Sequence, residues 1–329
     1  RNRWEVENVS KTVKLGMEHR KFAFDKEMEP AASIESGDSV VLETEDANCS
    51  LITKETDLWP EFKVIYETAG GCNPVTGPIY VNGAKPGDSL AVTINRVVPG
   101  FARGGGYTSI QSGVGALEDI NGTIQKPLEA RTRILRIEDG QVIYKLDNNE
   151  EYITIPLNPF VGTIGVAPKY DRRASFYKGK EWCGNVDCPD VKAGSTVLLP
   201  VHVEGALLSM GDVHGMQGDG EITGCAMECQ GIIEATVRVI PGEESTYLNW
   251  PQVDNKEWIG VISIANRGRL STAMVNGYVE LAKRMEREYG IPVCDGYMIL
   301  NLAGKVRIGN SGSCVCRIDR KLLEKYRLK

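Results

Sequence analysis

Short segments in which apolar and polar residues alternate recur along the sequence, and they constrain the fold more than any other feature. In 232–240, for example, Ile233 and Val237 would share one face of a strand and Glu234 the other. The turn sequences SGDS and PGDS lie at the start of two such segments. Period-two alternation is typical of half-buried strands, and it is found in 38–45, 88–98, 132–137, 141–146, 151–157, 196–203 and 232–240.

Helical spacing is clear in one region only. Met274, Tyr278 and Met285 recur at helical intervals and predict one long helix near 272–289. A short helix is also expected over 319–328. We therefore expect a β-rich α+β fold, mainly of antiparallel sheets in a β-sandwich or barrel-like arrangement, with few helices.

Length and composition fit a folded globular protein. The chain has 329 residues, of which 42% are hydrophobic and 25% charged. No strong linker divides it, so we expect a single unit over 1–329. Two closely packed β-rich subdomains, about 1–170 and 171–329, are the alternative.

Charge and cysteine content narrow the partners and the compartment. The net charge of -6, without a long Lys/Arg run, predicts that nucleic acid is not a partner. No apolar run approaches the roughly 18 residues of a membrane span, and the first residues lack the apolar core of a secretory signal. Nine cysteines without a CxxC pair favour reduced thiols, so we expect a cytoplasmic protein that does not associate with membranes.

The segment GDVHGMQGDGEITGCAMECQG, residues 211–231, concentrates acidic, amide and imidazole side chains among glycines. Asp212 and His214 are two residues apart, so they point to the same side if the backbone is extended. A carboxylate and an imidazole that converge in this way can bind a divalent metal such as Zn²⁺. Asp219 and Glu221 repeat the spacing and could form a second convergent pair.

A second acidic cluster, CGNVDCPD at 183–190, contains Asn185 and Asp187. Asp187 together with Asp212 and His214 gives too few ligands for a closed structural zinc site, but suits an open site that also holds water.

An open metal site needs a base nearby. Glu221 or Glu228 could take a proton from water and pass it to a leaving group. Solvated turn residues or helix caps are the alternative interpretation of all these carboxylates. A cysteine-ligated zinc is less favoured, because the cysteine pairs lack the usual spacing and have no histidines near them. A cysteine nucleophile is also less favoured, because buried apolar packing is the usual role of most cysteines.

Four segments of the chain resemble the acetamidase/formamidase family of metal-dependent amide hydrolases. The most specific is a "GN-hydrophobic-D" element followed about 25 residues later by GDxHxxQGDGE. The matching segments are 76–94, 162–168, 183–231 and, more weakly, 303–312. This chain departs from many relatives at CGN, at Glu204 and at GNSGS (309–313), which leaves the acyl specificity open.

The resemblance implies a β-rich fold, assembly into homo-oligomers, and hydrolysis of a short primary amide such as acetamide or formamide to a carboxylate and ammonia. We expect a divalent metal, zinc first, with calcium or another divalent ion as alternatives. The metal ligands are expected to be Asp187, Asp212 and His214, with Asp46 and His19 as further candidates. Catalytic roles are expected for Glu221, Glu228, Asp219, Gln217 and Asn185, the last two as donors to the developing oxyanion.

Two rival hypotheses remain at this stage. The same fold could bind a small ligand without hydrolysing it. A thiol-dependent amidase is the other, and it would be insensitive to chelators but inactivated by a Cys→Ser change.

Overall fold

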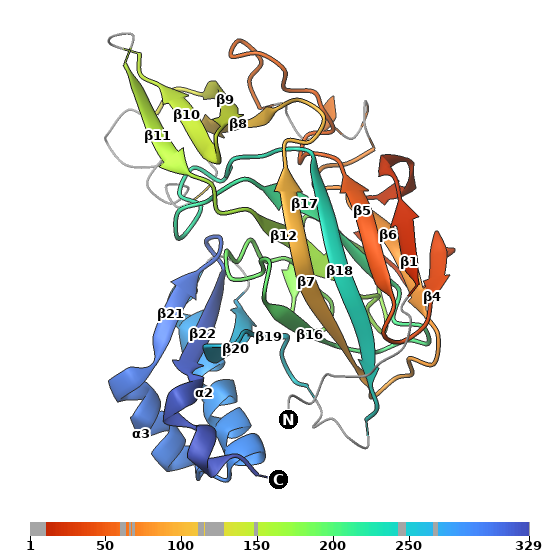
Figure 1. The fold of residues 1–329 in the computed structure, drawn as a ribbon, viewed down its shortest axis with the longest axis vertical. Helices are drawn as coiled ribbons and strands as arrows, with labels where there is room; N and C mark the ends of the chain where they lie inside the picture. Colours follow the sequence, from red (N-terminus) through yellow and green to blue (C-terminus); the bar gives the residue numbers. More distant parts are fainter. Residues whose placement is uncertain are drawn as a thin grey trace.

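The computed structural model describes residues 11–59, 64–65, 67, 70–110, 115, 128–147, 151–242, 248–265 and 269–328. Its largest sheet has nine strands and is mostly antiparallel (Figure 1). Their order is β1 (Thr12–Leu15), β5 (Ser39–Thr44), β18 (Gly231–Ile240), β7 (Ser89–Pro99), β16 (Thr196–Pro200), β19 (Gln252–Asp254), β20 (Trp258–Ile264), β22 (Ser313–Asp319) and β21 (Lys305–Ile308).

A seven-stranded sheet packs against the first and carries three of the predicted site residues, Asn185, Asp212 and His214. Its order is β14 (Lys178–Gly179), β15 (Cys183–Asn185), β12 (Phe160–Gly165), β17 (Leu208–His214), β6 (Val75–Val81) and β2 (Arg20–Lys21), with β4 (Ala32–Ile34) parallel to β6.

Two smaller sheets complete the β structure. One contains β11 (Tyr152–Pro156), β10 (Gln141–Lys145), β9 (Arg131–Glu138) and β8 (Gly105–Ile110), and projects at one end of the molecule in Figure 1. The other pairs β3 (Ala23–Phe24) with β13 (Arg173–Ala174).

The two large sheets form a sandwich, because their apolar faces share one hydrophobic core. Ile233 on β18 and Val213 on β17 both belong to it, and a Cβ at Gly231 would lie only 2.5 Å from Val213. On β18 the predicted alternation is confirmed: Ile233 and Val237 are buried, while Glu234 is half-buried. The expected β-rich α+β fold, mainly of antiparallel sheets, is therefore confirmed, while the division into domains stays a prediction.

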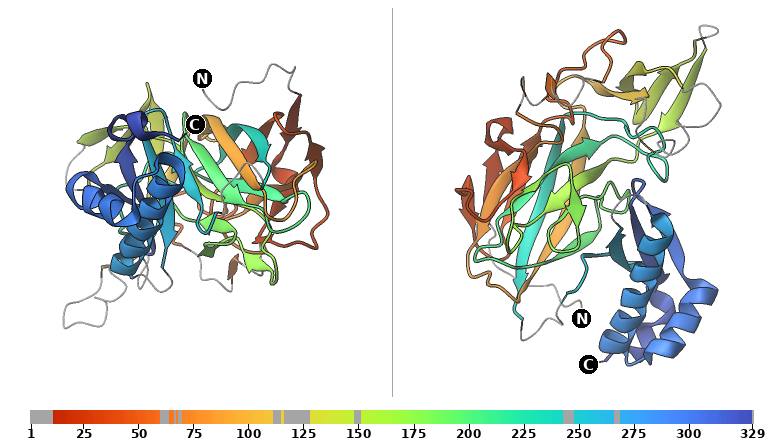
Figure 2. Two further views of the ribbon diagram at one scale, coloured as in Figure 1. Left: turned by 90° about the horizontal axis from the view of Figure 1, so that it is seen from below. Right: turned by 180° about the vertical axis from the view of Figure 1, so that it is seen from behind.

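Two α-helices in the described part of the chain, α2 (Leu270–Tyr289) and α3 (Val293–Ala303), pack beside β20 and β22 (Figures 1 and 2). The predicted long helix is confirmed. The side of α2 that packs on the sheet differs from the predicted one. Gly277 lies against Cys316, whereas Met274 is 39% exposed.

The prediction of a short α-helix over 319–328 is wrong. The segment forms two 3-10 turns, η4 (Arg320–Leu322) and η5 (Glu324–Tyr326); a further one, η1, spans Met17–His19. Only Leu323 is buried there, so little packing is available to offset the cost of starting an α-helix.

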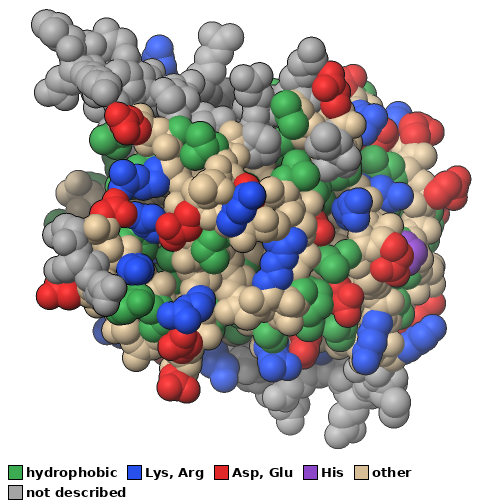
Figure 3. Space-filling view, turned by 90° about the horizontal axis from the view of Figure 1, so that it is seen from above, with side chains coloured by type: hydrophobic (Ala, Val, Ile, Leu, Met, Phe, Trp, Pro, Cys, Tyr) green, Lys and Arg blue, Asp and Glu red, His purple; other side chains and the backbone are tan. Residues whose placement is uncertain are grey.

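Two surface features bear on partners. None of the described helices combines the length and the apolar character that a membrane-spanning segment needs. On the face drawn in Figure 3, acidic and basic side chains are interspersed.

A buried ion-pair network fixes α2 to the large sheet. The Arg284 guanidinium donates to both carboxylate oxygens of Asp254, at 2.7 and 2.6 Å, and to Glu288 at 2.8 Å. It also donates to the Gly260 carbonyl at 3.1 Å, and Arg320 donates to Asp254 at 3.1 Å. The bidentate geometry makes this a strong, directional contact.

We expect Arg284→Ala to lower the free energy of unfolding by about 3 kcal/mol, because Asp254 and Glu288 lose their shared buried partner. Urea denaturation followed by circular dichroism measures this change. The neighbouring Lys283→Ala, at an exposed position of the same helix, is the control. An equal loss in the two variants would contradict the assigned role of the network.

Candidate metal centre

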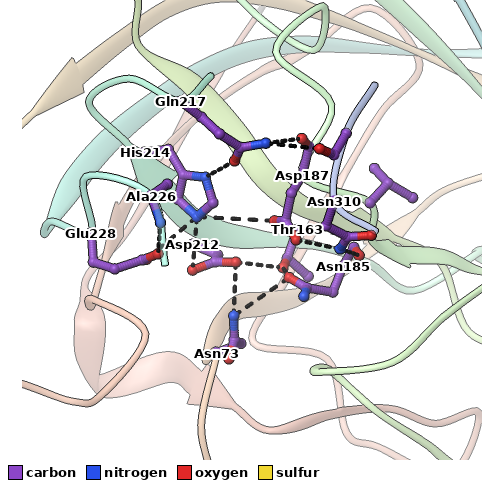
Figure 4. Close-up of polar contacts among 12 residues, drawn as sticks. Asn73, Thr163, Asn185, Asp187, Asp212, His214, Gln217, Ala226, Glu228 and Asn310 are labelled. Atoms are coloured by element: carbon purple, nitrogen blue, oxygen red, sulfur yellow. Dashed lines mark hydrogen bonds and ion pairs between the residues drawn. The ribbon is translucent and has the colours of Figure 1, made fainter. Parts of the chain in front are cut away.

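Strand pairing brings acidic residues from distant parts of the chain to one buried imidazole. β12 lies between β15 and β17 in the sheet. Asp212 and His214 lie on β17, and Asp187 follows β15. His214 also forms an isolated antiparallel bridge with Glu228. These four side chains point toward one another in Figure 4.

The backbone at the two aspartates is left-handed. Asp187 has φ 45° and Asp212 has φ 57°, a conformation that Asp tolerates better than most residues other than Gly. The expectation that Asp212 and His214 converge is met, but not through an extended backbone at Asp212. The alternation instead changes phase there, since Met210 and Val213, three residues apart, both belong to the main core.

Four polar atoms face each other without hydrogen-bond partners. His214 Nε2 lies 3.3 Å from Glu228 Oε2, 3.6 Å from Asp212 Oδ1 and 3.9 Å from Asp187 Oδ1. All four atoms are buried and unpartnered. Two ligands that are each about 2.1 Å from a tetrahedral ion are about 3.4 Å apart, so the spacing is compatible with a shared metal ion.

The remaining oxygen of Asp212 is held in place. Asn73 Nδ2 donates to Asp212 Oδ2 at 2.9 Å, and the Thr163 hydroxyl lies 3.0 Å from the same oxygen. Thr163 also lies 2.6 Å from Asn185 Oδ1. These contacts fix the carboxylate so that Oδ1 is the oxygen left for the cluster.

Asp187 and Glu228 show the same arrangement. Asn310 Nδ2 donates to Asp187 Oδ2 at 2.6 Å, and the backbone N–H of Ala226 donates to Glu228 Oε1 at 3.0 Å. Each carboxylate thus has one hydrogen-bonded oxygen and one free oxygen. Buried polar atoms are rarely left unsatisfied in proteins, so four that face one another are suited to binding a cation.

Gln217 fixes the orientation of the imidazole. Its amide nitrogen donates to the carbonyl oxygens of Asp187, at 2.9 Å, and Gly309, at 3.2 Å. Gln217 Oε1 must then accept from His214 Nδ1, 3.0 Å away. With the proton on Nδ1, the Nε2 lone pair is available to a metal ion, as in many metal-ligating histidines.

The electrostatics of the four groups favour a cation at their centre. Burial raises the pKa of Asp187 to about 7 and also raises that of Glu228. Burial alone would raise the pKa of Asp212 and lower that of His214. The charge of His214 reverses the shift at Asp212, and the charge of Glu228, followed by that of Asp212, reverses the shift at His214. Protons therefore neutralise part of the cluster, and a divalent ion could replace them.

Gly162 on β12 leaves room for the carboxylates. A Cβ there would lie 2.8 Å from Asp187 Oδ1 and 3.0 Å from Asp212 Oδ2. Any larger side chain would displace these oxygens, so the close approach requires glycine.

Glu221 lies close to the cluster. One oxygen of Glu221 lies within 4.8 Å of ligand atoms of His214 and Glu228, which forms a second group of potential ligands beside Asp187, Asp212 and His214. Its backbone is left-handed, with φ 45°. Burial, followed by the charge of Asp187, raises the pKa of Glu221 well above its ordinary value. A carboxyl with a raised pKa can act as a proton acceptor and donor in catalysis.

Three of the expected acidic and histidine residues lie outside both groups. Asp219 is exposed and forms an ion pair with Arg307. The His19 Nε2 atom lies 3.4 Å from Glu18 on the surface. Asp46 is buried, but its carboxylate accepts the backbone N–H groups of Asn48 and Ser50 at 2.9 and 3.1 Å. Burial raises the pKa of Asp46 to about 6.

Four further residues orient the cluster and were not among the predicted site residues: Asn73, Gly162, Thr163 and Asn310. Three of them lie in segments that carry the family resemblance, 162–168 and 303–312, and that location is the available signal. Asn73, in GGCNP, lies outside those segments.

The chain is similar to known formamidases and acetamidases. The putative formamidase of Schizosaccharomyces pombe is 29% identical over 254 residues, which cover 64% of this chain and 61% of that protein. The acetamidase structure from Yersinia enterocolitica has a TM-score of 0.85 at 30% identity, covering 96% of this chain and 94% of that one. The acetamidase structure from Bacillus halodurans has a TM-score of 0.83 at 31% identity, covering 96% and 100%.

Family-level matching spans most of the chain. Residues 8–181 and 171–258 match the Acetamidase/Formamidase family. The order of the motifs, the sandwich and the buried Asp/His/Glu cluster are all in place within or beside these segments. The chain belongs to the acetamidase/formamidase family.

Proposed function

We propose that the protein hydrolyses a short-chain primary amide, of the acetamide or formamide kind, to a carboxylate and ammonia with the help of a divalent metal ion. The observation that carries the proposal is the set of four unpartnered, buried atoms of Asp187, Asp212, His214 and Glu228. Family membership supports a small amide as the substrate.

We propose zinc as the metal, because an imidazole and carboxylates at these spacings suit it. Asp187, Asp212 and His214 would hold the ion. Glu228 Oε2, at 3.3 Å from His214 Nε2, is close enough to be a fourth ligand. A bound divalent ion would supply a positive charge that polarises the amide carbonyl and makes water more acidic.

Glu221 is then the proposed base. It takes a proton from the attacking water, whose oxygen adds to the amide carbon. When the C–N bond breaks, Glu221 returns the proton to the nitrogen, which leaves as ammonia. The raised pKa of Glu221 fits a group that both accepts and donates this proton.

Two amide side chains take different roles. Gln217 uses its amide nitrogen on two backbone carbonyls, so we assign it to positioning His214 instead of stabilising the oxyanion. Asn185 stays a candidate oxyanion donor, because its Oδ1 is engaged by Thr163 and its Nδ2 is the part left to donate.

The thiol-dependent alternative is less favourable on physical grounds. Burial raises the pKa of Cys72 and Cys229 to about 12. Burial, together with the charges of Glu228 and Glu221, raises the pKa of Cys225, beside the cluster, well above its ordinary value. A nucleophilic cysteine needs the opposite shift.

We also propose a cytoplasmic, homo-oligomeric protein. Nine free cysteines support a reducing compartment. The exposed apolar side chains Met298 and Leu302 on α3 support a surface that is available for self-association. Light scattering of the purified protein tests the oligomeric state.

The reaction is tested by measuring ammonia released from formamide, acetamide, propionamide and larger primary amides, before and after removal of metal by a chelator. We expect release that is lost on chelation and restored by Zn²⁺. The preferred acyl length reports the size of the substrate site. Bound metal without release from any of these amides would favour the binding-protein alternative, and release that resists chelation would favour a thiol mechanism.

We expect Asp212→Asn and His214→Ala each to weaken metal binding by about 100-fold or more and to abolish turnover, because each removes a ligand atom from the cluster. Metal content after dialysis and chelator competition measure the loss. His19→Ala, which changes the surface histidine, serves as the matched control. Retention of metal and activity in the double variant would rule out this ligand set.

We expect Glu221→Gln to lower kcat by about 10²- to 10⁴-fold while the protein keeps its metal, because the proton shuttle is lost. In the parent protein, activity should rise with pH as Glu221 loses its proton, and this rise should occur above the ordinary glutamate range because the pKa is raised. The rise should disappear in the variant. The exposed Glu204→Gln is the control, and a Glu221→Gln enzyme with normal kcat would show that another group is the base.

A further inference from the structure

The turn at residues 309–313, between β21 and β22, belongs to the edge of the nine-stranded sheet, yet it contacts the metal centre on the seven-stranded sheet. It lies beyond residue 258, where the family match ends. Its sequence, GNSGS, is also one of the departures from many relatives noted above. The turn thus connects the C-terminal hairpin to the metal centre.

Asn310 joins the turn to Asp187. Its Nδ2 donates to Asp187 Oδ2 at 2.6 Å and to the Asn185 carbonyl at 3.1 Å. Its Oδ1 accepts from the backbone N–H of Gly312 at 3.2 Å and from the Ser313 hydroxyl at 3.0 Å. Both ends of the amide are therefore engaged, and its orientation is fixed.

Gly309 joins the same turn to Gln217 and to the segment just before Glu221. Its carbonyl accepts from Gln217 Nε2 at 3.2 Å and from the backbone N–H of Gly220 at 3.0 Å. The first contact orients the partner of His214, and the second holds the loop just before Glu221. A Cβ at Gly309 would lie 2.3 Å from the Val186 carbonyl oxygen, so the approach requires glycine.

We propose that the 309–313 turn is an integral part of the metal centre, with Asn310 as the positioning residue that aims Asp187 Oδ1 at the ion. This inference rests on the proposed metal-dependent function. An amide donor on one carboxylate oxygen removes the freedom of the group to rotate and supports its ionised form. Hydrogen-bond partners of this kind are typically worth 10- to 100-fold in metal affinity.

The test compares Asn310→Leu and Asn310→Ala with the parent protein. Leucine has the branched shape of asparagine and the same number of side-chain heavy atoms, but it is larger and cannot donate, whereas alanine leaves a space. Affinity for Zn²⁺ is measured by competition with a chelator, and the visible absorption of the Co²⁺-substituted protein reports the ligand geometry. We expect both variants to bind Zn²⁺ about 10- to 100-fold more weakly, with an altered Co²⁺ spectrum.

Lys305→Ala is the matched control. Lys305 lies on β21 of the same hairpin and forms an exposed ion pair with Asp319 at 3.0 Å. We expect this variant to bind metal as the parent protein does. If Asn310→Leu does not fold, Asn310→Ser, which is smaller and keeps a hydroxyl donor, should bind metal more tightly than Asn310→Ala.

The outcomes separate this inference from the proposed function. Parent-like Zn²⁺ affinity and an unchanged Co²⁺ spectrum in both Asn310 variants would overturn the role of Asn310 and leave the metal centre intact. Weak binding by Asn310→Ala alone would assign the effect to packing and would also overturn the hydrogen-bond role. A parent protein that binds no divalent metal would overturn the proposed function, and this inference with it.

Discussion

Three carboxylates around one buried imidazole are the constraint on which the rest of the site depends. Asp187, Asp212 and Glu228 lie within 3.9 Å of His214 Nε2, and all are almost fully buried. Bringing these charges out of water costs free energy that a hydrocarbon core would not incur. Protonation relieves part of that cost in the free protein, as the raised pKa of Asp187 indicates, and a divalent ion would relieve more of it.

The local backbone follows from that constraint. The left-handed conformation at Asp212 changes the phase of β17, so that Val213 packs into the sandwich while its two polar neighbours turn toward the cluster. The missing side chain at Gly162 leaves the space that the carboxylates need. Strain and close approach are thus concentrated at the residues that carry the proposed chemistry.

The burial of each strand explains whether it could be predicted from the sequence. Strands such as β5 and β18 have one buried and one half-buried face, and their alternation revealed them. In contrast β12, β17 and β20 are buried on both faces, so no period of two appears in FVGTIG, LSMGDVH or WIGVISI. Asp212 and His214 were found from their spacing, and Glu228 was named as a candidate base from its place in the same acidic segment. Asn73 and Asn310 contact the site only through tertiary structure. No local pattern marks Asn73, and the place of Asn310 in the weakly matching segment 303–312 is its only signal.

Metal binding and folding are expected to be coupled in such a site. Asp212 and His214 come from one sheet, the Glu228 segment leads into β18 of the other, and the 309–313 turn closes the cluster from the edge of the nine-stranded sheet. An ion held by these groups links both layers of the sandwich to the C-terminal hairpin. A ligand that binds only the folded state stabilises it. The buried carboxylates, whose charges are unfavourable in the free protein, would therefore stabilise the fold once the ion is bound.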